Sequence, residues 1–313
     1  MNTRWYVAGA RAAVDELGGD AMLKWLVICL GILSALPELA MAQTKVLYEG
    51  DSAYNHVVVR EHDHERCLLF GAYADHRESC RDLTNPDRQV FEYTGMMLLG
   101  FALRPESKTI ALLGLGGATI PRIVARHLPE VRLDVAEVDP MIVKLTQQYF
   151  PVEESPRLKI FTADGRQFLR RSKVKYDQIL IDTFNSDYIP AHMTTKEFFD
   201  EMKNSLSSRG VIVMNVHRTN QLYLSQLATF RASYRSVLVF EGQGGNAIII
   251  AGDEPLPTNA AVLVQQTTAR NLKIPGIDLV AEAAKVVFDR RTGQAPVLTD
   301  DYAPANLLLH RHE

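Results

Sequence analysis

Short apolar runs recur along the chain from residue 109 onward, and most of them end at a glycine or an acidic side chain. Continuous apolar runs are typical of parallel strands that are buried on both faces of a sheet. Segments with helical spacing separate them, which predicts βαβ units with right-handed crossovers and hence an α/β fold. The expected strands are 109–114, 132–139, 157–161, 176–182, 210–216 and 247–251. Helices are expected up to His127, from Pro140, over 194–206 and at two places between 258 and 290.

The preceding segment, 45–103, has a different pattern that indicates a small β unit. Residues 57–61 alternate into a polar turn at 62–65, and a second strand follows from Cys67. A polar stretch then reaches Arg88, and 89–103 has the spacing of a helix that Pro105 ends. We therefore expect three parts: an N-terminal extension over 1–42, the β unit plus helix over 43–104, and the main domain over 105–313.

The extension contains the features of a secretory signal. Lys24 precedes twelve uncharged residues, 25–36, and then come Pro37 and the small-x-small sequence 40–42. This predicts cleavage after Ala42 and export to the periplasm, with Met22 as the true start or residues 1–21 as a long leading region. The alternatives are an uncleaved membrane anchor through residues 25–36, a buried helix, and a cytoplasmic protein in which residues 22–42 are not an export signal.

Composition narrows the class of protein. The chain has 313 residues, of which 47% are hydrophobic and 23% charged, so global disorder is excluded. The net charge of −3 comes without a basic stripe, so we expect no nucleic-acid partner. Of three cysteines, Cys29 would leave with the signal. Cys67 and Cys80 would then form a disulfide in an exported protein, or remain two reduced thiols.

Candidate chemistry lies at the ends of four successive predicted strands, the edge where open α/β sheets bind ligands. The first strand ends in a glycine-rich turn, which allows close approach to the backbone, and acids about 20 residues later suit ribose hydroxyls. The phosphate-loop lysine pattern is missing, and the third glycine of the dinucleotide fingerprint is displaced, so a single nucleoside is expected. The residues are Gly114, Gly116 and Gly117; Glu137 and Asp139; Asp164 with Gly165; and Asp182.

This layout resembles the Rossmann-like fold of adenosylmethionine-dependent methyltransferases and, more narrowly, the spermidine synthase (polyamine aminopropyltransferase) family. The resemblance covers roughly residues 45–250 and includes the small N-terminal β unit. It implies a homodimeric transferase of polyamine biosynthesis that uses decarboxylated S-adenosylmethionine, a small amine and no metal. The stretches that carry it are 52–55 (SAYN), 113–117 (LGLGG), 136–140 (AEVDP), 163–169 (ADGRQFL) and 176–182 (YDQILID).

The resemblance also implies residue roles. Glu137 matches the carboxylate that binds ribose, and Asp164 the residue that accepts from the adenine amino group. Asp182 matches the catalytic aspartate that takes a proton from the attacking amine. Tyr54 and Tyr93 match tyrosines that line the substrate site.

Several positions depart from the family pattern. Ala118 stands where the family has an acid after its glycines, and Asn55 replaces a glutamine. Thr94 and Gly95 replace a His or Gln followed by a Glu, and Asn185 replaces a second aspartate. A diamine carries two charges that need carboxylate partners, so Asp187 is a candidate to supply one.

Three functions therefore stay open: aminopropyl transfer, methyl transfer from adenosylmethionine, and nucleoside binding by a non-catalytic exported protein.

Two further patterns in the sequence also have purely structural interpretations. His62 and His64 lie in a predicted exposed turn, so we expect no metal there. The segment 298–302, with Asp300, Asp301 and Tyr302, either folds back over the site or forms an exposed turn with a capping aspartate.

Overall fold

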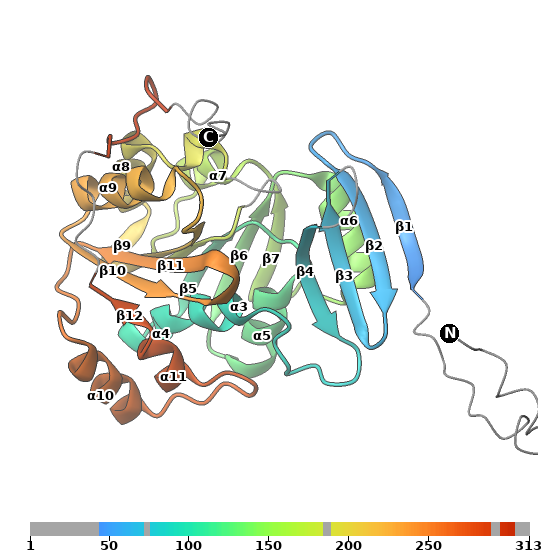
Figure 1. Ribbon diagram of the computed structural model, residues 1–313, viewed down its shortest axis with the longest axis horizontal. Coiled ribbons are helices and arrows are strands. Elements are labelled where there is room, and N and C mark those ends of the chain that lie inside the picture. The colour runs from blue at the N-terminus through green and yellow to red at the C-terminus, as the bar shows by residue number, and fades with distance from the viewer. Residues whose placement is uncertain (1–43, 72–75, 184–188, 289–294, 304–313) are drawn as a thin grey trace, which may run out of the picture. The chain divides into compact units, whose positions relative to one another are not determined.

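The computed structural model describes residues 44–71, 76–183, 189–288 and 295–303 (Figure 1). Residues 44–313 form one compact unit. The extension over 1–42, as well as Asn185 and Asp187, lies outside the described residues. Within the described ranges, no helix is both long and apolar enough to cross a membrane.

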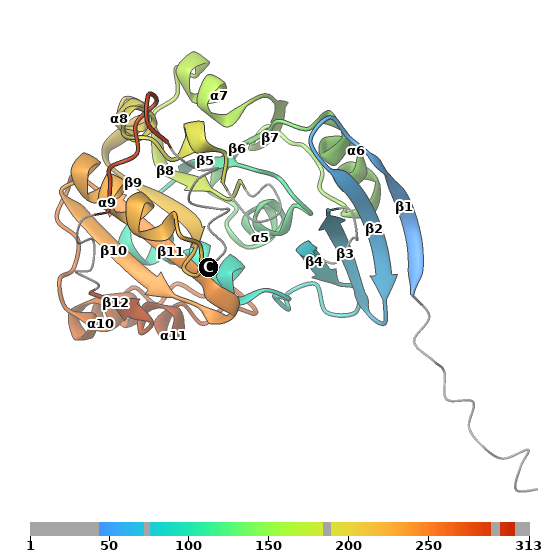
Figure 2. The ribbon, with the colours of Figure 1, turned by 45° about the horizontal axis from the view of Figure 1, so that its top comes forward.

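A four-stranded antiparallel sheet opens the described chain, in the order β1-β2-β3-β4. Its strands are β1 (Lys45–Asp51), β2 (His56–His62), β3 (Glu65–Phe70) and β4 (His76–Asp82). Side chains alternate between its faces. Val57 and Leu68 belong to one buried cluster with residues of helix α6 (Pro140–Tyr149), whereas Val58 and Leu69 pack on the opposite face. Figure 2 shows α6 beside this sheet.

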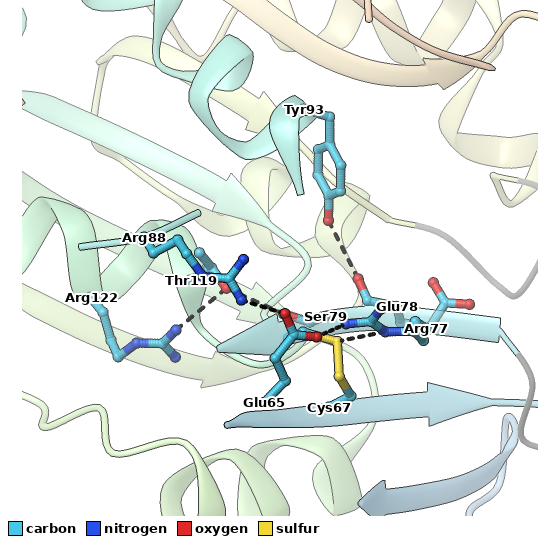
Figure 3. Close-up of a disulfide and its surroundings, with 10 residues drawn as sticks. Glu65, Cys67, Arg77, Glu78, Ser79, Arg88, Tyr93, Thr119 and Arg122 are labelled. Carbon is cyan, nitrogen blue, oxygen red and sulfur yellow. Dashed lines mark hydrogen bonds and ion pairs between the residues drawn. A yellow bond between two sulfur atoms is a disulfide. The ribbon is translucent and has the colours of Figure 1, made fainter. Parts of the chain in front are cut away.

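Strand β4 lies in the stretch for which the sequence predicted no strand. Its sequence, HRESCRD, has no apolar alternation, so it carries no periodic signal. The strand is defined instead by backbone pairing with β3 and by a disulfide between Cys67 and Cys80, which lie opposite each other with 4.1 Å between their Cα atoms. The structure thus decides the open question of the two cysteines in favour of the disulfide (Figure 3).

We expect this disulfide to contribute about 3 kcal/mol to the free energy of unfolding, because it closes a short loop in the unfolded chain. Denaturant titrations of the wild type and of the Cys67→Ser/Cys80→Ser double variant measure the loss. Alkylation of the full chain without reductant, followed by intact-mass measurement, should label Cys29 at most. Labelling of Cys67 and Cys80 would contradict the disulfide.

The second sheet has eight strands in the order β12-β10-β11-β9-β8-β5-β6-β7. Five consecutive strands, β5 to β9, pair in parallel, as predicted, and β10 and β11 are antiparallel additions. The bounds are β5 (Thr109–Leu113), β6 (Arg132–Glu137), β7 (Leu158–Thr162), β8 (Tyr176–Ile181), β9 (Leu206–His217), β10 (Ser236–Glu241), β11 (Asn246–Gly252) and β12 (Val286–Val287).

Helices cover both faces of this sheet (Figures 1 and 2). One buried cluster joins the sheet to α3 (Glu92–Met97), α4 (Leu99–Leu103), α5 (Thr119–His127), α10 (Ala260–Arg270) and α11 (Leu279–Ala283). A second joins the other face to α7 (Gly165–Arg171), α8 (Lys196–Lys203) and α9 (Tyr223–Ser233). Short 3₁₀ turns, η1 (Ala191–Met193) and η2 (Gln243–Gly245), complete the described elements.

Two helix predictions need correction. The helix expected over 89–103 begins at Glu92 and is divided at Leu98, whose ψ of 1° departs from helical geometry. Helix α9 was not predicted, because it buries polar side chains such as Gln226 and Thr229 together with apolar ones. Its sequence therefore lacks the one-sided apolar stripe on which helix prediction depends.

The topology gathers the predicted functional positions. Strand β5 has β6 on one side and β8 on the other, so the order of the strands reverses at β5. In open α/β sheets, ligands bind at such a switch point, beyond the carboxyl ends of the strands.

Candidate active site

A cavity of about 340 Å³ opens at this edge of the sheet. This volume is within the range of pockets that bind small molecules and nucleosides. It brings together all of the predicted site residues except Gly117, which is not in its lining, and Asp187, which lies outside the described residues. The predicted residues in the lining are Tyr54, Asn55, Tyr93, Gly114, Gly116, Glu137, Asp139, Asp164, Gly165 and Asp182.

The glycine-rich turn after β5 forms one wall of the cavity. Gly114 has a φ of +99°, and a Cβ atom there would collide with the backbone carbonyl oxygen of Asp182. Gly117 instead packs against the small sheet, because a Cβ atom at this position would lie 2.8 Å from the Ser79 hydroxyl and 3.1 Å from the ring of Phe150. Gly117 thus packs closely within the turn and is not part of the cavity lining, and its contact with a cofactor stays a prediction.

Glu137, at the end of β6, fixes this turn. Its Oε2 accepts a hydrogen bond from the backbone N–H of Leu115 at 2.9 Å, and its Oε1 accepts from that of Asp139 at 3.0 Å. Burial raises the pKa of the Glu137 carboxyl group. The carboxylate therefore connects the ends of two strands while it faces the cavity.

Asp139 has one carboxylate oxygen engaged and one available. Its Oδ1 accepts from the backbone N–H of Met141 at 2.8 Å and caps helix α6. Its Oδ2 is buried and has no hydrogen-bond partner within the described part of the chain. A buried acceptor without a partner is costly, so a ligand hydroxyl group in the cavity would satisfy it. This observation fits the ribose of a nucleoside.

Asp164 follows β7 and caps helix α7. Its Oδ1 accepts from the backbone N–H of Gln167 at 2.9 Å, and its Oδ2 lies 2.9 Å from Nε2 of His192. Gly165 lets the helix start close to the cavity floor, because a Cβ atom there would lie 3.1 to 3.3 Å from atoms of Met193 and Leu113.

Asp182 directly follows β8 at this edge of the sheet. Asn215 on β9 donates through Nδ2 to Oδ1 of Asp182 at 3.0 Å. Burial raises the pKa of the Asp182 carboxyl group, and hydrogen bonds from Asn215 and Tyr93 act in the opposite direction. The result is a carboxylate that holds a proton more tightly than an exposed aspartate, which suits a general base.

The tyrosines reach the cavity from the N-terminal part of the chain. Tyr93 lies on α3, and its hydroxyl group donates to the backbone carbonyl oxygen of Glu78 at 3.4 Å. Tyr54 and Asn55 lie in the turn between β1 and β2, which Ser52 closes by accepting from both of their backbone N–H groups. Tyr54 is 49% exposed, so it stands at the cavity rim.

The contributing residues that were not predicted from the sequence include Glu78, Ser79, His192 and Asn215. Asn215 had a signal, since it is a polar residue within the apolar run 210–216. His192 follows no strand and lies in a 3₁₀ turn, and Glu78 and Ser79 belong to the polar strand β4. Their positions depend on tertiary packing that no local pattern indicates.

The segment 298–302 does not line the cavity, so the alternative in which it folds over the site is wrong. Asp300 forms a two-pronged ion pair with Arg166, with 2.8 and 2.7 Å between the paired atoms, and accepts from the Thr195 hydroxyl at 2.7 Å. It anchors the C-terminal segment to α7 and α8. Asp301 and Tyr302 are exposed, and neither lines the cavity.

Comparison with known proteins agrees with this architecture. The family model of the spermine/spermidine synthase domain matches residues 91–246. The chain is 33% identical to a polyamine aminopropyltransferase from Vibrio vulnificus over 293 residues, which cover 90% of this chain and 98% of that protein. The chain belongs to the polyamine aminopropyltransferase family. The resemblance inferred from the sequence motifs is thereby confirmed.

Solved structures support the fold. A probable spermidine synthase from Corynebacterium glutamicum superimposes with a TM-score of 0.64 at 21% identity, over 82% of this chain and 97% of that one. Human methyltransferase-like protein 13 in complex with SAH matches with a TM-score of 0.52 at 26% identity, over 57% of this chain and 90% of that one. Both structures therefore share the fold of this chain over the parts that they cover.

Proposed function

We propose that this protein transfers an aminopropyl group from decarboxylated S-adenosylmethionine to an amine, releasing methylthioadenosine. Family membership supports this reaction, and the acidic lining of the cavity supports it for this chain. The described lining contains no lysine or arginine, and its acidic members are Glu78, Glu137, Asp139, Asp164 and Asp182. Such a lining favours ligands with positive charge.

Both proposed substrates carry that charge. The decarboxylated donor has a sulfonium and an ammonium group, and a diamine acceptor has two ammonium groups. The acceptor nitrogen attacks the carbon beside the sulfonium, the new C–N bond forms as the C–S bond breaks, and one proton must leave the nitrogen. We assign this proton transfer to Asp182, because its raised pKa suits a general base better than that of an exposed aspartate.

The nucleoside half would be held by the other acids. We assign Glu137 and Asp139 to the ribose hydroxyl groups, with the unpartnered Oδ2 of Asp139 as the acceptor that most needs a donor. We assign Asp164 to the adenine amino group and the turn at Gly114 and Gly116 to backbone contact with the donor. Tyr54, Asn55 and Tyr93 would line the amine side, and Asp187 stays a candidate there.

A methyltransferase activity is the second candidate, and the match to human methyltransferase-like protein 13 favours it. Adenosylmethionine differs from the decarboxylated donor by one carboxylate, which the acidic lining would repel. Calorimetry with the full chain should therefore give an affinity for decarboxylated adenosylmethionine that exceeds the affinity for adenosylmethionine by about tenfold or more. Equal affinities, or a preference for adenosylmethionine, would favour methyl transfer.

The role of Asp164 can be tested separately. We expect Asp164→Ala to weaken methylthioadenosine binding by about 1–3 kcal/mol, the cost of an unsatisfied buried partner. The loss of the α7 cap should also lower stability by about 1 kcal/mol. Asp278→Ala is the matched control, since it removes the cap of α11 outside the cavity and should leave the affinity unchanged. Unchanged affinity in Asp164→Ala would remove Asp164 from the nucleoside site.

Three properties implied by the sequence remain proposals. We propose a domain boundary at 104/105, a homodimer, and export or anchoring through 22–42. Light scattering of the full chain tests the dimer, and fractionation of cells that express a C-terminally tagged chain tests export. The donor is made in the cytoplasm, so a cytoplasmic location would favour the enzyme, whereas export would place the nucleoside-binding alternative first.

A further inference from the structure

The small sheet contributes a carboxylate to the cavity that the family resemblance did not predict. Glu78 on β4 lines the cavity together with its neighbour Ser79. Adjacent residues of a regular strand point to opposite faces of a sheet, so both would not normally reach one cavity. The local geometry of β4 explains how they do.

Strand β4 has an irregularity at this point. Leu68 of β3 pairs with Ser79, but the next residue, Leu69, pairs with Arg77. Glu78 is therefore the extra residue of a β-bulge, which the register between the two strands skips. Bulges next to active sites re-aim a side chain. Here the bulge allows both Glu78 and Ser79 to face the cavity.

The strand is held firmly on both sides of the bulge. Cys80 is joined to Cys67 by the disulfide, and the Arg77 guanidinium group donates to the Cys80 sulfur at 3.2 Å and also pairs with Glu65 (Figure 3). Ser79 hydrogen-bonds to Thr119 at 3.3 Å, at the start of α5. The position of Glu78 is thus fixed relative to the glycine-rich turn.

Glu78 also lies near the reacting groups. The Tyr93 hydroxyl group donates to the backbone carbonyl oxygen of Glu78, as Figure 3 shows. The pKa of Tyr93 is raised first by burial and then by the negative charges of Asp182 and Glu78. Both carboxylates therefore act on the same hydroxyl group, from opposite sheets.

The glycine-rich turn has no room for an acid on this side, because Ser79 packs against Gly117. Ala118 is fully buried and outside the lining. Two other acids of the cavity hold local structure: Glu137 binds two backbone N–H groups, and Asp164 caps a helix.

We propose that Glu78 binds a protonated amino group of a substrate and so determines the preference for amine-bearing ligands. This inference rests on the proposed function. The ammonium group belongs either to the aminopropyl arm of the donor or to the acceptor amine, and the two sources can be separated by binding measurements that need no turnover.

Calorimetry with the full chain compares the wild type with Glu78→Gln, which removes the charge and keeps the shape. For the donor arm, the probes are decarboxylated adenosylmethionine and methylthioadenosine, which lacks the amino group. For the acceptor arm, the probe is diaminobutane, which carries two ammonium groups, bound to enzyme saturated with methylthioadenosine. Glu49→Gln is the matched control, because Glu49 lies on β1 of the same sheet and outside the cavity.

Loss of about tenfold or more in affinity for decarboxylated adenosylmethionine, with methylthioadenosine unchanged, would place the donor ammonium at Glu78. A similar loss for diaminobutane, with methylthioadenosine unchanged, would place the acceptor ammonium at Glu78. The inference is wrong if Glu78→Gln leaves the affinities for decarboxylated adenosylmethionine and diaminobutane unchanged. It is also wrong if the variant lowers the affinity for methylthioadenosine by the same factor. Failure of the proposed function is a separate result, seen when the wild type binds these ligands but forms no aminopropylated product.

Discussion

Replacement of Asp182 by asparagine should abolish aminopropyl transfer while nucleoside binding stays nearly intact. A positioned general base contributes about 10²–10⁴-fold to the rate, and asparagine cannot accept the proton. The hydrogen bond from Asn215 can still be made to the amide oxygen, so the site should keep its shape. Turnover and methylthioadenosine affinity, measured on the same preparation, test both halves of this prediction.

The pH dependence has a definite sign. Burial raises the pKa of Asp182 above its ordinary value of 3.8, so the wild-type rate should fall as the pH drops through that raised value and the base becomes protonated. The folded protein also binds this proton more tightly than the unfolded chain does. The free energy of unfolding therefore decreases as the pH rises from the ordinary to the raised pKa. At neutral pH, Asp182→Asn should be at least as stable as the wild type.

Asp177→Asn is the matched control. Asp177 lies at the other end of β8 and accepts from the backbone N–H groups of Lys108 and Thr109, away from the cavity. This variant should keep its turnover. A high rate in Asp182→Asn would show that the base lies elsewhere, with Asp187 as the next candidate.

The second large effect is expected for Gly114→Ala. The positive φ of +99° is unfavourable for any residue with a Cβ atom, and the added atom would collide with the carbonyl oxygen of Asp182. Backbone strain of about 1–2 kcal/mol and overpacking of about 1–3 kcal/mol should together lower the free energy of unfolding by about 3 kcal/mol. Because the clash separates the glycine turn from the strand that carries Asp182, donor binding should be lost as well.

Gly244→Ala separates these two causes. Gly244 also has a positive φ, of +64°, but a Cβ atom there would meet nothing within 4 Å. In Gly244→Ala, the free energy of unfolding should fall only by the backbone contribution, and the donor should bind normally. Denaturant titration and calorimetry measure the two quantities. A Gly114→Ala protein as stable as Gly244→Ala would contradict the close approach of the turn to Asp182.

The parallel core of the fold could be predicted from the sequence because burial on both faces of a strand produces an uninterrupted apolar run. Residues 110–113 and 211–214 are such runs. Strand β4 could not be predicted in this way. Its polar sequence is compatible with a loop, and only the backbone ladder and the Cys67–Cys80 disulfide define it.

The same physical reason limits prediction of the site. Glu137, Asp164 and Asp182 could be found because they directly follow predicted strands, whose carboxyl ends must meet at one edge. Glu78 and His192 reach the cavity from a bulged strand and a 3₁₀ turn. Their approach depends on how the small sheet and the η1 segment pack against that edge, which residue spacing does not record.

The most direct test of the proposed reaction is product analysis by mass spectrometry. The full-length chain is incubated with decarboxylated adenosylmethionine and diaminobutane, and in parallel with adenosylmethionine and the same amine. We expect methylthioadenosine and the aminopropylated diamine in equal amounts in the first reaction, and neither methylated amine nor S-adenosylhomocysteine in the second. Formation of S-adenosylhomocysteine in the second reaction, with no methylthioadenosine in the first, would contradict aminopropyl transfer and identify the protein as a methyltransferase.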